Sequence, residues 1–61
     1  MGHRLYYIVA VTDGKRLFVV RDNGCTEHFR EALMFDLREA AEDYALAMDE
    51  RREAMVMSID I

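Results

Sequence analysis

The chain has 61 residues and a mass of 7.1 kDa, with 52% hydrophobic and 33% charged residues, one cysteine, no proline and a formal net charge of −4. This length allows one small domain with a marginal core, and the composition is that of a folded chain. A single cysteine excludes an intramolecular disulfide framework, and no apolar stretch approaches the roughly 20 residues that a membrane span needs.

Residues 5–21 predict a β-hairpin. Aromatic and β-branched residues dominate both halves of this segment, and such residues favour strands. Asp13-Gly14 lies between the halves and is typical of a two-residue type I′ turn, because that turn needs a positive φ at both positions. The turn then places Thr12 opposite Lys15, which defines the register of the two strands.

Both faces of this hairpin are apolar, although a half-exposed antiparallel strand normally alternates apolar with polar residues. One face carries Leu5, Tyr7, Val9, Val11, Phe18 and Val20. The other face carries Tyr6, Ile8, Ala10, Leu17 and Val19. Each face therefore needs a cover.

A second turn is predicted at Asp22-Asn23-Gly24, and residues 25–29 are consistent with a short third strand. The following segment, residues 29–35, fits either a short helical turn or an irregular crossover. Two alternatives stay open for this part of the chain.

Residues 36–52 predict a helix without glycine or proline, with Asp36 as the N-cap and Glu39 completing a capping-box pattern. One helical stripe is apolar and consists of Leu37, Ala40, Ala41, Tyr44 and Met48. Residues 55–61 alternate and predict a final strand. We expect Met55, Met57, Ile59 and Ile61 to point inward in that strand.

The element order predicts an α+β fold of the type ββ(β)αβ, a single domain with a small, mainly antiparallel sheet and one helix packed on one face. One helix covers only one face of such a sheet. We expect the face formed by Tyr6, Ile8, Ala10, Leu17 and Val19 to be a self-association surface, which makes a homodimer the simplest assembly. The alternatives are a heterologous partner, or a register that puts the other face inward.

The sequence carries few groups suited to catalysis or metal binding. Cys25-x-x-His28 supplies two potential ligands and His3 a third, but this spacing is not that of a recognised zinc site. Cys25 also lacks an evident orienting group for nucleophilic chemistry. We therefore expect no metal, no cofactor and no enzymatic activity.

Charge is unevenly distributed along the chain. Residues 1–30 contain five basic and three acidic residues, whereas residues 31–61 contain three basic and nine acidic ones. An acidic chain is poorly suited to binding nucleic acid directly and better suited to a protein partner with a basic surface.

The predicted helix carries an acidic face opposite its apolar stripe. This face consists of Glu39, Glu42, Asp43, Leu46, Asp49 and Glu50. One interpretation is a solvated surface with a single exposed leucine. The other is a partner-binding surface, in which an apolar anchor is surrounded by carboxylates that imitate the phosphate row of a nucleic acid.

Two family resemblances follow from these residues. The hairpin with Asp13-Gly14, then Gly24-Cys25, then the helical run 38–42 resembles the N-terminal domain of HicB-type antitoxins, which implies neutralisation of a toxin ribonuclease. The Pro-rich stretch that precedes Gly-Cys in those proteins is absent here. A hairpin followed by Ala32-x-x-Phe35-Asp36-x-x-Glu39-Ala40 is similar to small phage and prophage inhibitors, among them anti-CRISPR proteins.

The expected function is therefore a protein-binding module of the phage-inhibitor type. It would block a nucleic-acid-acting host complex through the acidic helix face. The alternatives are a HicB-like antitoxin and a structural subunit of a larger assembly. With a lone cysteine and neither a signal peptide nor a membrane segment, we expect a cytoplasmic protein.

Overall fold

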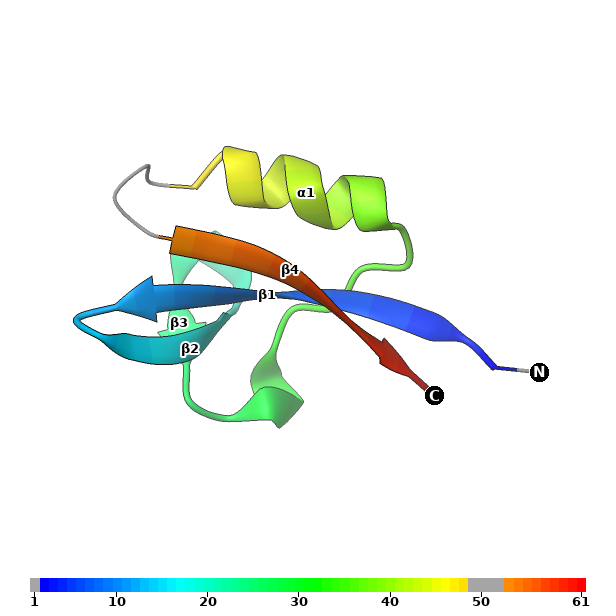
Figure 1. The fold of residues 1–61 in the computed structure, drawn as a ribbon, viewed down its shortest axis with the longest axis horizontal. Helices are drawn as coiled ribbons and strands as arrows, with labels where there is room; N and C mark the ends of the chain where they lie inside the picture. The colour runs from blue at the N-terminus through cyan, green and yellow to red at the C-terminus, as the bar shows by residue number, and fades with distance from the viewer. Residues whose placement is uncertain (1, 49–52) are drawn as a thin grey trace.

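The fold is a four-stranded antiparallel sheet with one helix across it, seen in a computed structural model that describes residues 2–48 and 53–61. Its elements are β1 (Arg4–Thr12), β2 (Lys15–Val19), η1 (Arg21–Asn23), β3 (Cys25–Thr26), η2 (Phe29–Glu31), α1 (Arg38–Leu46) and β4 (Glu53–Asp60), where η denotes a short 3-10 helix. The strands lie in the order β3-β2-β1-β4, and α1 lies over one face (Figure 1). The predicted α+β class is confirmed.

The hairpin has the predicted turn. Asp13 and Gly14 have φ values of 52° and 78°, and Thr12 lies opposite Lys15. Left-handed backbone at two successive positions gives the twist that matches the flanking strands. The local sequence was therefore sufficient to predict the register of β1 with β2.

The segment between β3 and α1 combines the two alternatives that the sequence left open. It begins with the 3-10 turn η2 and continues as extended chain beside β1. Phe35 exchanges two backbone hydrogen bonds with Tyr6, of 2.8 and 2.9 Å, and the Leu33 N–H donates to the Val19 carbonyl at 3.0 Å. The predicted third strand is shorter than residues 25–29, because only Cys25 and Thr26 pair with β2.

Helix α1 begins later and ends earlier than the predicted range of 36–52. Its N-cap is Leu37, which is extended (φ −117°, ψ 136°), and no side chain caps the helix. The predicted Asp36 capping box is therefore wrong. The Asp36 carboxylate instead lies 3.6 Å from His3 Nε2. The predicted helical residues 49–52 lie outside the described residues.

The assignment of the two sheet faces needs a correction. The face with Ile8, Ala10 and Val19 lies beneath α1, and all three residues are completely buried within the chain. Tyr6 packs against the same core, and Leu17 lies opposite Ala10 in the ladder. The predicted self-association surface is therefore wrong, because its central side chains are not accessible to a second copy.

In the final strand, too, the inward and outward sides are exchanged relative to the prediction. Met55 and Met57 are 48% and 41% exposed, whereas Ala54 and Val56 pack against the core. The expectation that the methionines and isoleucines of this strand point inward is wrong. The strand begins at Glu53, and exposure alternates from Glu53 to Met57 with the phase opposite to that predicted, whereas Ser58 is exposed and Ile59 is half-buried.

Small side chains explain which face α1 covers. Ala41 and Ala45 of α1 meet a sheet face whose members include Ala10 and Ala54. Small residues on both layers allow the helix to approach the sheet closely, and close packing stabilises the core. Of the predicted helical stripe, Ala41 and Met48 are buried, whereas Leu37 is 67% exposed.

Candidate protein-binding surfaces

The sheet face opposite α1 is apolar. Alternation along each strand and pairing across the ladder place eight side chains from β1, β2 and β4 on it. They are Leu5, Tyr7, Val9, Val11, Phe18, Met55, Met57 and Ile59. The rows run across strands, for example from Met57 to Tyr7 and from Met55 through Val9 to Phe18. Cross-strand neighbours of this kind form a continuous surface.

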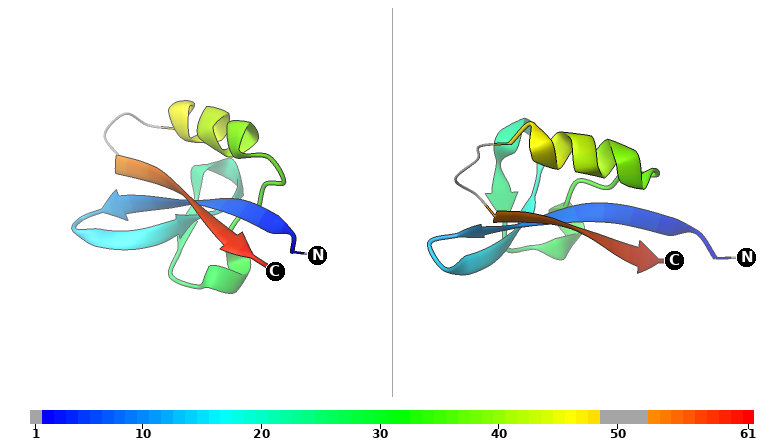
Figure 2. Two further views of the ribbon diagram at one scale, coloured as in Figure 1. Left: turned by 45° about the vertical axis from the view of Figure 1, so that its right-hand side comes forward. Right: turned by 45° about the horizontal axis from the view of Figure 1, so that its top comes forward.

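An aromatic cluster packs over one side of this face. The η2 turn folds against the sheet on the side away from α1 (Figure 2). Its Phe29 ring lies 5.1 Å from Tyr7 and 5.3 Å from Phe18, in edge-to-face geometry, and the Tyr7 and Phe18 centroids are 5.9 Å apart. Phe29 itself is 37% exposed. We call these nine residues the open face: Leu5, Tyr7, Val9, Val11, Phe18, Phe29, Met55, Met57 and Ile59.

The open face is of a size that is often functional. The strands that form it, β1, β2 and β4, have 22 residues of about 3.3 Å each at a spacing of about 4.8 Å, which gives a footprint of roughly 350 Å². Contiguous apolar patches on monomeric proteins rarely exceed a few hundred Å², and the largest of them are often functional. The two most exposed members, Met55 and Met57, are adaptable side chains that are common at binding surfaces.

Two charges border the open face at its hairpin end. Arg16 and Glu53 both lie opposite Val11, one on β2 and the other on β4. They share its face of the sheet and are separated by two strand spacings, or about 10 Å. This row therefore carries a cation on one side of β1 and an anion on the other.

The acidic helix face lies on the other side of the molecule. Glu39, Glu42 and Asp43 are exposed, and Leu46 is 82% exposed. Glu42 accepts a 2.9 Å ion-paired hydrogen bond from Arg38, which partly offsets the negative charge. The predicted members Asp49 and Glu50 lie outside the described residues.

Leu46 and Glu42 also border a shallow hollow between α1 and β4. Ala45, Ala54 and Val56 form the rest of its lining. The acidic helix face is therefore continuous with the β4 edge of the sheet.

The possible metal ligands do not converge. Cys25 packs against the core, whereas His28 is exposed and His3 lies beside Asp36. Among residues 2–48 and 53–61, no group of three or more His, Cys, Asp or Glu side chains could hold a metal ion.

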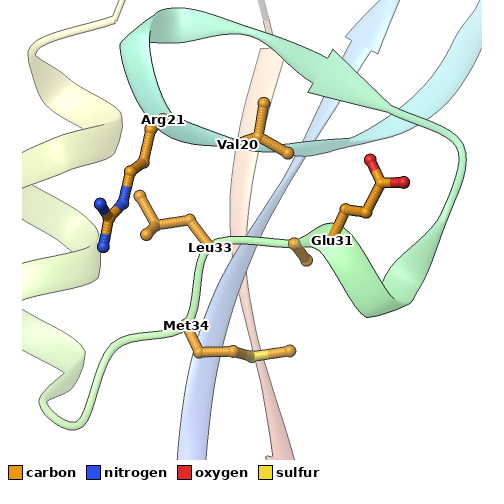
Figure 3. A pocket seen from close by; sticks show the side chains of 6 residues that line it. Val20, Arg21, Glu31, Leu33 and Met34 are labelled. Carbon is orange, nitrogen blue, oxygen red and sulfur yellow. The ribbon is translucent and has the colours of Figure 1, made fainter.

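A second surface hollow, of about 560 Å³, lies between the end of β2 and the crossover segment. Its lining consists of Val20, Arg21, Glu31, Ala32, Leu33 and Met34. Arg21 and Glu31 extend from opposite ends of the hollow and point away from each other (Figure 3). The two charged side chains therefore do not form an acid–base pair.

An ion pair joins the outer ends of β1 and β4. Arg4 Nε donates to Asp60 Oδ1 at 2.9 Å, and this carboxylate raises the pKa of Arg4 above its ordinary value. Both side chains are largely exposed, so the pair contributes little to stability.

The sequence reasoning missed Phe29, Met55 and Met57 as surface residues of one face. The signal that could have found them is side-chain size. The inward side of the helix carries Ala41 and Ala45 beside Tyr44, and a face containing Ala10 and Ala54 leaves more room for it than one containing Tyr7 and Phe18.

Comparisons with known proteins identify no relative. No family model, no curated protein and no solved structure matches the chain. In the described part of the chain, no helix has the length and apolar character needed to cross a membrane.

Proposed function

We propose that this chain is a non-enzymatic protein-binding module. The observation that carries the proposal is the open face, with Met55 and Met57 exposed on the side of the sheet that α1 does not cover. An apolar face with a footprint of roughly 350 Å² is costly to leave partly in water for a domain with so small a core. Binding to protein removes this cost.

The acidic helix face supports a more specific proposal, namely inhibition of a protein that acts on nucleic acid. Leu46 is the most exposed large apolar residue among those described, and Glu42 and Asp43 lie within one turn of it. A central apolar anchor with surrounding charges suits a desolvated contact with a basic patch. The single cysteine, Cys25, suits action in a reducing cytoplasm.

The alternatives differ in what the helix face contacts. A HicB-like antitoxin would use this face against a toxin ribonuclease, whereas a phage-type inhibitor would use it against a host complex. A structural subunit would dock its open face on a non-identical chain and would not need the helix face.

The test compares three proteins immobilised on a support. They are the wild type, the double reversal Glu42→Lys/Asp43→Lys on α1, and the control reversal Glu27→Lys/Glu31→Lys at exposed positions away from α1. Both variants change net charge by the same amount. Each is exposed to a lysate of the source cells, and the retained proteins are identified by mass spectrometry.

We expect the wild type and the control to retain a nucleic-acid-acting protein that the α1 variant fails to retain. The purified partner should lose activity on its nucleic acid when the wild type is added, and keep it with the α1 variant. Equal retention by all three proteins would refute the role of the helix face.

A further inference from the structure

We propose that the open face is occupied by a second copy of this chain, in a symmetric sheet-on-sheet dimer with its two-fold axis along β1. This inference rests on the proposed protein-binding function and names one partner of the module. It replaces the association surface predicted from the sequence with the opposite face of the sheet.

The chemistry of the open face suits contact with itself. Its strand residues are aliphatic, aromatic or methionine, and its charges stand only at the hairpin end. A partner with a basic surface would bury cations against this face without counter-charges, which is unfavourable. A second open face presents the same apolar chemistry, and methionines adapt to small mismatches in shape.

The area is that of a weak dimer. Two footprints of roughly 350 Å² give about 700 Å² in total, which is below the roughly 1,200–2,000 Å² of stable interfaces and in the range of weak, transient association. The exposed side chains Met55 and Met57 stand in the middle rows of the sheet, opposite Val9 and Tyr7. Both lie on the edge strand β4, one strand from the proposed axis along β1, so each copy contributes them to one side of the interface.

The net charge of −4 does not oppose this arrangement. The acidic residues of α1 lie on the far side of the sheet from the open face (Figure 2). The η2 turn stands on the open face, so the two sheets lie at least as far apart as the roughly 10 Å of stacked sheets. Each helix lies beyond its own sheet, so the acidic faces are separated by more than the Debye length of about 8 Å at physiological salt.

The charged row at the hairpin end selects the direction of the axis. A two-fold axis along β1 places β4 of one copy over β2 of the other, with strands aligned to within about 30°. Glu53 then faces Arg16 of the second copy, and symmetry makes this pair twice. An axis across the strands would place Glu53 over the opposite end of β4, far from any Arg16.

The resulting dimer has four layers, with both α1 helices on its outer surfaces. The two acidic faces then point in opposite directions. The dimer can engage two basic surfaces at once, or one symmetric target if its sites match this spacing.

The first test measures mass by light scattering and sedimentation between roughly 1 and 200 µM. We expect a species of about twice the 7.1 kDa chain mass. Met57→Lys should raise the dimer dissociation constant at least about 100-fold, because it buries an unpaired charge. Met55→Lys is a second variant with the same expectation, and both residues are exposed enough for the monomer to fold.

Leu46→Lys is the matched control. It makes the same apolar-to-lysine change at an exposed position on α1 and should leave the dimer intact. Far-UV circular dichroism verifies that each variant is folded. A monomeric wild type at 200 µM overturns the inference. So does a dimer that survives both methionine variants, because another surface, such as the edge of β4, would then hold it.

The second test examines orientation. Glu53→Arg and Arg16→Glu should each weaken the dimer by roughly 3- to 10-fold, and the combined variant should recover most of the loss. Two outcomes overturn the axis along β1. In one, neither single reversal changes the dimer dissociation constant; in the other, the combined variant weakens the dimer by the product of the two single effects.

Failure of this inference and failure of the proposed inhibitory role are distinguishable. A folded monomer that still binds its target through α1 contradicts the dimer alone. A dimer whose target binding is insensitive to Glu42→Lys/Asp43→Lys contradicts the role of the helix face alone.

Discussion

Gly14 shows how much a single residue determines in this chain. Its φ of 78° follows the 52° of Asp13, and this pair of left-handed residues turns β1 directly into β2. Glycine adopts this region without steric cost, and aspartate tolerates it better than most residues. The register of the hairpin, and with it the division of side chains between two faces, depends on these two positions.

We expect Gly14→Ala to lower the free energy of unfolding by about 1 kcal/mol, because a Cβ is strained at this φ. No heavy atom lies within 4 Å of a Cβ added there, so the cost is conformational rather than steric. Urea unfolding followed by circular dichroism measures it. Gly2→Ala is the control, since its added Cβ also meets nothing and Gly2 has no positive φ. Equal stability of the two variants would contradict this account of the turn.

At the scale of elements, the sheet has two apolar faces but only one helix. A helix of nine residues is too short to be stable alone, so α1 depends on its contact with the sheet. It covers the face built around Ile8, Ala10 and Val19, and the aromatic and methionine-rich face has only the short η2 turn against it. The phase of β4 follows from that choice, because its pairing with β1 fixes which of its residues point toward α1.

Two identical substitutions on opposite faces test this assignment. Ile8→Val should lower the free energy of unfolding by about 1 kcal/mol, since Ile8 is completely buried and the change leaves a void. Ile59→Val removes the same methylene from the partly exposed open face and should cost less than about 0.5 kcal/mol. Both are measured in the Met57→Lys background, which excludes a contribution from association.

The reverse ranking, with Ile59→Val the more costly change, would contradict the burial of the Ile8 face beneath α1.

For the whole molecule, the small core and the uncovered face are connected. A chain of 61 residues buries a limited fraction of its surface. Among the described residues, six apolar side chains are buried. Association through the open face would enlarge the buried apolar core without lengthening the chain. The stability of the fold would then depend on the protein concentration.

This coupling predicts a concentration-dependent melting temperature. Each tenfold increase in protein concentration should raise the Tm of the wild type by about 5 °C, as mass action requires for a dimer that unfolds with dissociation. Differential scanning calorimetry over two decades of concentration measures the slope. The Met57→Lys variant should show no dependence. A wild-type Tm that is independent of concentration would contradict coupled folding and association.

The helix boundaries show why part of the fold could not be predicted. Asp36 and Glu39 have the residue types of a capping box, yet the helix begins after Leu37, and Asp36 lies beside His3 near the N-terminus. That contact joins residues far apart in the chain. Local propensity contains no information about such a neighbour, so boundaries are less predictable than the existence of the helix.

The sequence by itself determined the α+β class, the order of the elements, the Asp13-Gly14 hairpin and its register, because these depend on local propensity and turn chemistry. Only the tertiary structure decided which face α1 covers. Both faces are apolar, so hydrophobic pattern alone cannot rank them. The decision comes from packing between layers, where Ala41 and Ala45 of α1 share one core with Ala10 and Ala54, and the larger side chains of the open face lie outside that core.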